Sequence, residues 1–325
     1  MRQPENTPKR FTNMVTNSDI QAARERIRGI AQITPVLTSR SFNSEAGLEV
    51  FFKCENLQLG GAFKIRGAAN FVNSLAKEKL RQGVVAFSSG NHAQAVAIAA
   101  KRAGTHATVV MPLDAPKAKA DATAAYGAHI VRYNRFTQDR EALARKVSEE
   151  TGAETVPPFD HPLIIAGQGT AAAELLEQVT NLDALITPVG GGGLLSGTAI
   201  AAKAFNPGLR IFGAEPTLAN DTFLSFQKGS IVSIPVPETI ADGLRAPSPG
   251  KLTFPIIQHN VEQIILVTEE EILAAMKFLL VRLKILVEPS GAVPAAAVLF
   301  RKLPAGIGKV GVILSGGNVD FPIPF

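Results

Sequence analysis

The 325-residue chain contains a single cysteine, Cys54, and no tryptophan. One cysteine cannot form a disulfide within the chain, which fits a reducing compartment. The N-terminal segment has no apolar stretch of the kind that a secretory signal requires. The most apolar late segment is interrupted by Lys277, Arg282 and Lys284, so it makes a poor membrane span. We therefore expect a soluble cytoplasmic protein that does not bind a membrane.

The chain also lacks a run of basic residues, although its net charge is +5 and its pI is near 9.3. Lysine and arginine are dispersed, and no aromatic-rich strand accompanies them, so the sequence does not indicate a nucleic-acid partner. A mild positive potential suits an anionic cofactor and substrate instead. A polar N-terminal arm, from Met1 to about Thr12, is expected to be disordered.

Strand and helix patterns alternate along the chain, and its length suggests two domains. Ser18 is the expected N-cap of the first helix, and Thr268 with Glu271 predicts a capping box for a late one. Expected strands are Leu48–Lys53, Val84–Phe87, Ala107–Met111, Ala128–Arg132, Ala184–Thr187, Arg210–Ala214, Gln263–Val267 and Lys309–Leu314. Expected helices include one after Lys64, Ala93–Ala103, Ala118–Tyr126, Gln138–Glu150, Ala166–Gln178 and Ser290–Arg301. This alternation predicts an α/β fold with two doubly wound domains and parallel sheets.

In parallel sheets, ligands bind at the carboxyl ends of the strands, and glycine- or serine-rich segments follow several of the expected strands. A different segment, Gly60 to Gly67, places Lys64 at the start of a helix. The helix terminus and partial desolvation both lower a lysine pKa, so the amine can be neutral and form a Schiff base. Taken alone, such a lysine is also compatible with a solvated surface charge.

Two further segments can bind anions. Ser88 to His92 follows a strand and opens a helix, so free N–H groups and a serine hydroxyl can hold a carboxylate or a phosphate, although an ordinary N-cap explains it equally well. Four consecutive glycines, Gly190 to Gly193, indicate a nest of N–H groups around a phosphate. The motif matches neither a P-loop nor a dinucleotide fingerprint. After the last strand, Ser315 can bond a ring nitrogen or belong to an ordinary turn.

Together these motifs resemble the fold type II pyridoxal-phosphate (PLP) enzymes, and among them the serine/threonine dehydratases and serine racemases. The resemblance extends from about Ile20 to Asp320 and implies a tryptophan synthase β-like fold. It implies a large PLP-binding domain of residues 1–53 and 156–325 and a small domain of residues 54–155. The motifs are ENLQ-x-x-x-AFKIRGA, SSGNHAQAVA, GGGGLLSG, EPSGAV and SGGNVD.

The resemblance also implies roles for individual residues. Lys64 would form the Schiff base with PLP and act as base on the substrate Cα–H, with Phe63 beside the cofactor ring. Asn91 would bond the ring hydroxyl, and Ser315 would face the pyridine nitrogen. The phosphate would be bound by backbone N–H groups of Gly190, Gly191, Gly192, Gly193 and Leu194. The substrate carboxylate would be surrounded by Ser88, Ser89, Gly90 and His92. Ser89 matches the acid–base serine of the racemases.

A divalent-cation site is implied as well. The segment from Glu215 to Asp221 resembles the cation loop of the racemase branch, with Glu215, the carbonyl of Ala219 and Asp221 as ligands. These oxygen ligands suit Mg²⁺, Mn²⁺ or Ca²⁺. The ion would order the domain without touching PLP. Spacing alone is more typical of two surface acids with no ion.

The expected activity is dehydration of L-threonine, L-serine or a bulkier β-hydroxy-α-amino acid to a 2-keto acid and ammonia. Relatives commonly read T-G-S before the Phe-Lys pair, where this chain has Gly60-Gly61-Ala62, and Ala246 replaces a frequent serine. These differences predict a roomier, less polar pocket, for example for phenylserine, unless they are neutral. The alternatives are an amino acid racemase and a non-catalytic nucleotide-binding protein. A homodimer is the family expectation.

Overall fold

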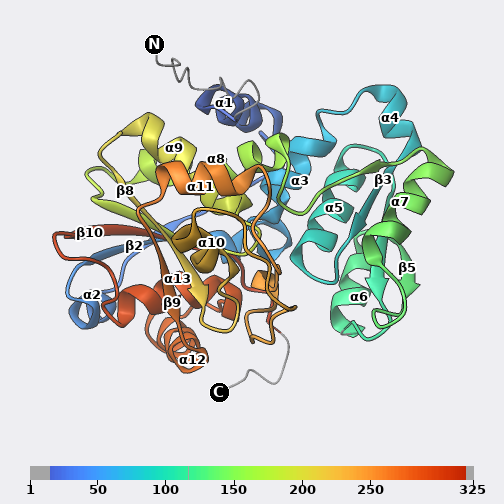
Figure 1. Cartoon of the computed structure of the whole chain (residues 1–325). Coiled ribbons are helices and arrows are strands. Elements are labelled where there is room, and N and C mark those ends of the chain that lie inside the picture. The colour runs from blue at the N-terminus through green and yellow to red at the C-terminus, as the bar shows by residue number, and fades with distance from the viewer. Residues whose placement is uncertain (1–14, 116, 320–325) are drawn as a thin grey trace, which may run out of the picture.

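The computed structural model describes residues 15–115 and 117–319, and it contains one parallel and one largely parallel sheet with helices packed against their faces (Figure 1). The expected N-terminal arm up to Thr12 lies outside the described residues. Among the described residues, no helix is long and apolar enough to cross a bilayer.

The large sheet has the strand order β1-β2-β10-β7-β8-β9. Only β1 is antiparallel to its neighbour, and the other pairs are parallel. Val50, Phe52 and Ile186 are fully buried, as expected for strands that are covered on both faces. The strands are β1 (Val36–Leu37), β2 (Glu49–Cys54), β10 (Lys309–Leu314), β7 (Ala184–Pro188), β8 (Arg210–Pro216) and β9 (Gln263–Val267).

Helices cover both faces of the large sheet (Figure 1). One face packs against α1 (Asn17–Arg26), α8 (Pro162–Gln178), α9 (Gly193–Phe205) and α11 (Thr253–Asn260). The other packs against α2 (Arg40–Ala46), α12 (Glu269–Phe278), the π-helical turn η4 (Leu279–Leu283) and α13 (Pro289–Leu299). The short helix α10 (Asp221–Lys228) follows β8.

The small sheet has the order β5-β4-β3-β6, and all its pairs are parallel. Its strands are β5 (His129–Tyr133), β4 (Ala107–Pro112), β3 (Val84–Phe87) and β6 (Glu154–Thr155). Its helices are α3 (Lys64–Val72), α4 (Lys77–Gln82), α5 (Asn91–Arg102), α6 (Lys117–Ala125) and α7 (Arg140–Thr151). Short 3₁₀ turns are η1 (Glu55–Leu57), η2 (Leu59–Gly61) and η3 (Asp242–Leu244).

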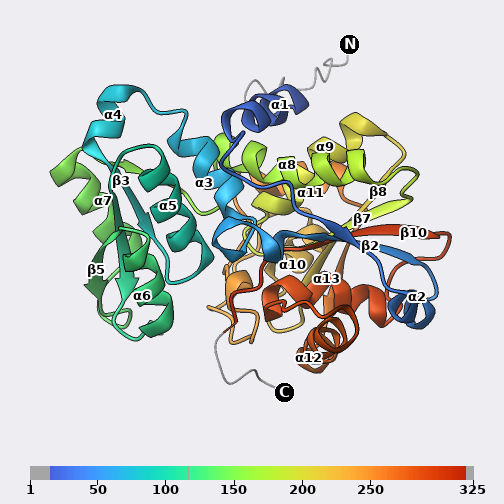
Figure 2. The same cartoon turned by 180° about the vertical axis from the view of Figure 1, so that it is seen from behind.

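Helix α8 contacts α3 and α9 backbone to backbone, through glycines. A Cβ on Gly167 of α8 would lie 2.6 Å from the Arg66 carbonyl oxygen of α3. A Cβ on Gly197 of α9 would lie 2.5 Å from the backbone nitrogen of Gly169. Figure 2 shows α3 lying between the two sheets. Because α3 begins at Lys64 and α9 at Gly193, α8 fixes the starts of two helices that carry predicted site residues.

The predicted fold class is confirmed, and most element boundaries agree to within a few residues. Strands β3, β9 and β10 have the predicted bounds, and Thr268 with Glu271 forms the predicted capping box. Ser18 is not the first N-cap: Thr16 is, because its hydroxyl accepts from the Asp19 N–H while Asp19 accepts from the Thr16 N–H. The prediction missed the short helices α2, α4, α10 and α11.

Candidate active site

Lys64 is the first residue of α3, where the sequence predicted it. Its Nζ donates a 2.8 Å hydrogen bond to the Pro158 carbonyl and lies 5.2 Å from the centre of the Phe63 ring. Desolvation lowers the pKa of Lys64 to about 8, although the carboxyl of Glu288 opposes the shift. A larger fraction of this amine than of a solvated lysine is therefore neutral near neutral pH, and the neutral amine is the form that attacks an aldehyde.

The glycine loop, Gly190 to Gly193, leads into α9 with Gly192 as its N-cap. Gly192 has a φ of 92°, which favours glycine, and a Cβ on Gly191 would lie 2.4 Å from the Phe159 ring. No described residue accepts a hydrogen bond from the N–H of Gly192 or Gly193. These unpaired donors at a helix N-terminus fit a phosphate group.

Helix α5 begins at Asn91, and its N-cap Gly90 has no side chain to cap it. The Gly90 N–H donates to Ser88 Oγ over 3.2 Å, so the serines and the helix start lie together. Burial, followed by the charge of Lys64, lowers the pKa of His92 to about 3, and the Val156 carbonyl does not offset this. His92 is therefore neutral and donates through Nε2 to that carbonyl at 2.9 Å, which favours a structural role for this nitrogen.

Glu288, which sequence reasoning did not single out, lies among the predicted cofactor residues. Its Oε1 accepts a 2.7 Å hydrogen bond from Nδ2 of Asn91, whose Oδ1 accepts one of 2.8 Å from Asn318. Burial, and then the charge of Asp242, raises the pKa of Glu288 to about 8. Glu288 opens the EPSGAV motif, and its acidic residue in an otherwise apolar segment is the signal that could have identified it.

Ser315 is buried, and its carbonyl accepts a 3.0 Å hydrogen bond from the Phe63 N–H. The next residue, Gly316, pairs with Ala62 in an isolated β-bridge. A Cβ on Gly316 would lie 2.3 Å from Oε1 of Glu288. The structure therefore brings the lysine segment, the Asn91 helix start and the Ser315 turn together.

The predicted cation ligands lie together at the end of β8 and the start of α10. Glu215 accepts from the backbone N–H groups of Thr222 (3.2 Å) and Phe223 (2.9 Å). Both side-chain oxygens of Asp221 are buried and accept no hydrogen bond from any described residue. Burial, and then Asp221, raises the pKa of Glu215 well above its usual range, and burial raises the pKa of Asp221 to about 7. A buried carboxylate without a partner fits a cation.

Beside the two carboxylates, the hydroxyl oxygen of Thr222 is also buried and has no hydrogen-bond partner among the described residues. Within residues 15–115 and 117–319, no group of three or more histidine, cysteine, aspartate or glutamate side chains could hold a metal ion. The resemblance implies that the backbone carbonyl of Ala219 completes the ligand set.

A buried ionic network lies directly behind the lysine segment. Arg66 pairs with Glu55 at 2.7 Å and with Glu174 at 2.7 Å, and Lys53 pairs with Glu174 at 2.8 Å. Burial pushes the pKa of Glu55 upward, but Arg66, Thr34 and Lys53 together hold it below its ordinary value. Two cations and two anions balance, and they join β2, η1, α3 and α8.

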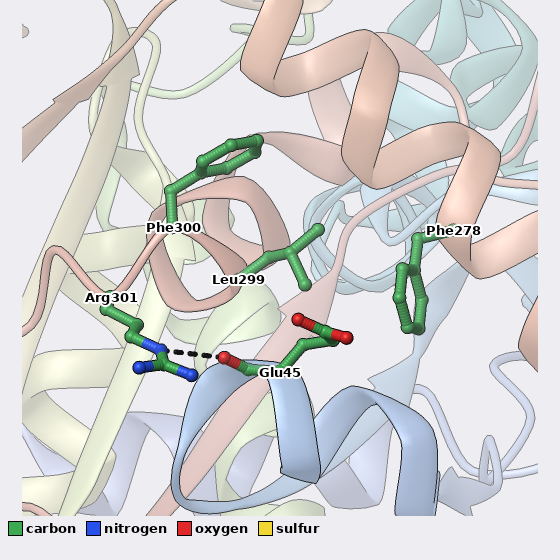
Figure 3. Close-up of a pocket in the computed structure, with 5 residues that line it drawn as sticks. All are labelled: Glu45, Phe278, Leu299, Phe300 and Arg301. Carbon is green, nitrogen blue, oxygen red and sulfur yellow. Dashed lines mark hydrogen bonds between the residues drawn. The ribbon is translucent and has the colours of Figure 1, made fainter.

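A surface pocket on the large sheet's helices is separate from these residues (Figure 3). It is lined by Glu45, Phe278, Leu299, Phe300 and Arg301, and Arg301 Nε donates to the Glu45 carbonyl at 2.8 Å. None of the predicted site residues lines it, so it plays no part in the site around Lys64.

A partly buried lysine with a lowered pKa, together with a glycine loop at a helix start on a parallel α/β scaffold, defines a fold type II PLP enzyme. The family model described as "Pyridoxal-phosphate dependent enzyme" matches residues 27–316, and the chain belongs to this family. The chain is 53% identical to the L-threo-3-hydroxyaspartate ammonia-lyase of Saccharomyces cerevisiae, over 94% of each protein. It is 50% identical to the serine racemase of Schizosaccharomyces pombe, again over 94% of each.

Solved structures agree with these relatives. The structure of maize serine racemase superposes with a TM-score of 0.93 at 45% identity and covers 95% of both chains. The prediction of a PLP-dependent lyase from the dehydratase and racemase group is therefore confirmed. The roles of the individual site residues stay predictions.

Proposed function

We propose that this PLP-dependent enzyme removes water from a β-hydroxy-α-amino acid and releases a 2-keto acid and ammonia. The observation that carries the proposal is the amine of Lys64, which starts α3, has a pKa lowered to about 8 and contacts Pro158. Bound PLP would supply the electron sink that acidifies the substrate Cα–H. In its neutral form, Lys64 would take that proton as the general base.

The other predicted residues would bind the cofactor and the substrate and orient them. Gly190 to Leu194 would bind the phosphate through backbone N–H groups, and the start of α5 would bind the substrate carboxylate through its own free N–H groups. Asn91, held by Glu288 and Asn318, has a fixed side chain with which to meet the cofactor ring. Ser315 would complete the ring contacts from the turn beside Phe63.

For the β-substituent we propose a carboxylate, so that threo-3-hydroxyaspartate is the preferred substrate. Arg140 begins α7 at the same edge of the small sheet as Ser88, and its guanidinium carbon lies 5.6 Å from the centre of the Phe87 ring. A guanidinium suits a second carboxylate on the substrate. Two relatives named as L-threo-3-hydroxyaspartate ammonia-lyases, at 53% and 49% identity, support this choice. Phenylserine, predicted from the small residues Gly60 to Ala62, is the competing substrate.

Racemisation is a second candidate activity. Ser89 matches the acid–base serine of racemases, and relatives named as serine racemases reach 50% identity. If Lys64 and Ser89 act on opposite faces, S89A should abolish racemisation and leave dehydration of the L-substrate measurable. Chiral chromatography of reactions with L-serine measures the two products separately.

We also propose that a divalent cation binds Glu215, Asp221 and the carbonyl of Ala219. The buried oxygens of Asp221 that lack partners support it. The ion would neutralise two carboxylates and hold the end of β8 to the start of α10, so its contribution would be to stability. A homodimer, a cytoplasmic location and the domain boundaries at residues 53–54 and 155–156 remain predictions, and size-exclusion chromatography tests the first.

The test uses the purified protein and a K64A variant. The wild type should bind PLP covalently, seen as a visible absorbance band that disappears when sodium borohydride reduces the Schiff base and leaves the cofactor permanently attached, and K64A should show neither. Keto acid release is then measured with serine, threonine, threo-3-hydroxyaspartate and phenylserine. Absence of covalent PLP would overturn the enzyme proposal. Faster turnover of phenylserine or threonine than of hydroxyaspartate would overturn the substrate proposal alone.

A further inference from the structure

The segment that connects the small sheet to α8 contacts both ends of the proposed PLP site. Pro158 accepts the hydrogen bond from Lys64 Nζ, and the Phe159 ring packs against Gly191, where a Cβ would lie 2.4 Å away. Asp160 follows directly. Residues 158–160 are therefore adjacent to the amine and to the glycine loop, although no predicted role falls on any of them.

Asp160 binds the backbone before and at the start of α11. Its Oδ2 accepts from the Lys251 N–H at 2.9 Å, and its Oδ1 accepts from the N–H groups of Leu252 at 2.9 Å and Thr253 at 3.2 Å. Gly250 leaves room for this carboxylate, since a Cβ there would lie 2.2 Å from Oδ1. Asp160 thus fixes the position of Thr253.

Thr253 in turn holds the glycine loop. It is fully buried, and its Oγ1 donates a 2.7 Å hydrogen bond to the Gly191 carbonyl. The same Oγ1 accepts from the Gly250 N–H at 2.9 Å, and that N–H also lies 3.2 Å from the Gly191 carbonyl. The loop is therefore held between the Phe159 ring on one side and the Thr253 hydroxyl on the other.

The hydrogen bond from Thr253 to the Gly191 carbonyl also fixes the direction of the Gly192 N–H. The Gly191 carbonyl and the Gly192 N–H belong to one planar trans peptide, so they point in opposite directions. Because the carbonyl points to Thr253, the Gly192 N–H points away from α11, and no described residue accepts from it. Its direction is set before any phosphate binds, so orienting this peptide costs less conformational entropy on binding.

We propose that Asp160 and Thr253 are positioning residues for the cofactor phosphate: Asp160 fixes Thr253, and Thr253 orients the Gly191–Gly192 peptide. This inference rests on the proposed PLP function, and it concerns the phosphate alone. Neither side chain needs to touch PLP or substrate.

The test compares PLP with pyridoxal, which has the same aldehyde and ring but no phosphate. T253V removes the hydroxyl and keeps the shape of the side chain, whereas T253S keeps the hydroxyl. T253V should weaken PLP binding roughly three- to tenfold, the range for one lost hydrogen bond, and leave pyridoxal affinity unchanged. T253S should retain the wild-type ratio of the two affinities. Equilibrium dialysis with each compound gives both constants.

Asp160 gives a second, independent test in case T253V does not fold. D160A should reduce the ratio of PLP to pyridoxal affinity, and D160N, which keeps one acceptor oxygen, should reduce it less. The matched control is D183N. Asp183, like Asp160, accepts hydrogen bonds from backbone N–H groups, here those of Gly308 and Lys309, but it lies at the far end of the large sheet. D183N should leave the ratio unchanged.

The outcomes separate this inference from the proposed function. If wild-type protein binds neither compound covalently, the proposed function itself fails. If PLP binds through Lys64 but T253V and D160A weaken PLP and pyridoxal equally, the two residues are merely structural and the inference is overturned. Unchanged affinities for both compounds in both variants overturn it as well.

Discussion

Asn91 and Glu288 lie 197 positions apart in the sequence, and Nδ2 of Asn91 donates a 2.7 Å hydrogen bond to Oε1 of Glu288. The carboxyl is buried, with its pKa raised to about 8, next to the amine whose pKa is lowered to about 8. The site therefore contains an acid that stays largely protonated at neutral pH and a base that is partly neutral there. Both groups titrate in the same pH range.

The first prediction concerns stability. The folded-state pKa of Glu288 is above its ordinary value of 4.5, so the folded protein binds the proton more tightly and loses stability as the pH rises from about 4.5 to about 8. E288Q has no such proton, so its Tm relative to wild type should increase over that range and level off above it. Calorimetry of the apoenzyme at pH 5 and pH 9 measures this, with E45Q as the exposed control. A constant difference in Tm would contradict the buried titration.

The second prediction concerns capture of the cofactor. Only the neutral amine attacks the PLP aldehyde, so the rate at which apoenzyme takes up PLP should rise with pH and level off above about 8. Stopped-flow absorbance measures the rate. Because the Glu288 carboxyl raises the pKa of Lys64, E288Q should move the midpoint to lower pH. A midpoint near 10.5, the ordinary value for lysine, would mean that the amine is solvated.

The third prediction concerns the ionic network behind Lys64. R66M should destabilise the protein by about 3–5 kcal/mol, because it leaves the carboxylates of Glu55 and Glu174 buried without their main partner. The control is R24M, since Arg24 pairs with the exposed Glu177, and a surface pair contributes about 0–1 kcal/mol. Urea unfolding gives both values. If R66M and R24M lowered the free energy of unfolding equally, breaking the buried network would cost no more than breaking a surface ion pair.

The fourth prediction concerns the cation. Mg²⁺, Mn²⁺ or Ca²⁺ at 100 times its dissociation constant should stabilise the folded protein by about 2.7 kcal/mol, since it binds the folded state. D221N should abolish the rise in Tm, because Asp221 supplies the buried oxygens without partners. E262Q, which alters an exposed carboxylate paired with Arg210, should preserve it. A rise in Tm that survives D221N would place the ion elsewhere.

The sequence predicted those site features that depend on one segment at a time. Lys64 at a helix start, the glycine loop and the Ser88 turn each follow from local pattern. The glycine loop follows β7 of the large sheet and the Ser88 turn follows β3 of the small sheet, so both lie at the carboxyl ends of parallel strands, where ligands bind. The shift from Ser18 to Thr16 is a local error, because both residues can cap a helix and only the reciprocal bonds with Asp19 decide between them.

What the sequence did not predict depends on distant partners. Arg66 and Glu174 are 108 positions apart, and Asp160 and Thr253 are 93 apart. Neither pair has a periodicity or motif of its own, since an arginine in a helix or an aspartate in a loop is ordinarily solvated. Their pairing follows from how α3, α8 and α11 pack, and single-sequence patterns do not contain that information.

The glycine contacts of α8 have a consequence for engineering this enzyme. Gly167 and Gly169 leave no space for a methyl group against α3 and α9, so added bulk there would push the two helices apart. The Lys64 amine and the N–H groups proposed to bind phosphate lie at the first turns of those helices, and the distance between them would change with the crossing angle of the helices. A mutational library aimed at new substrates should therefore leave α8 untouched and diversify the turn around Ser88. Inactive variants with substitutions in α8 would then reflect a changed distance between α3 and α9 rather than a lost contact with substrate.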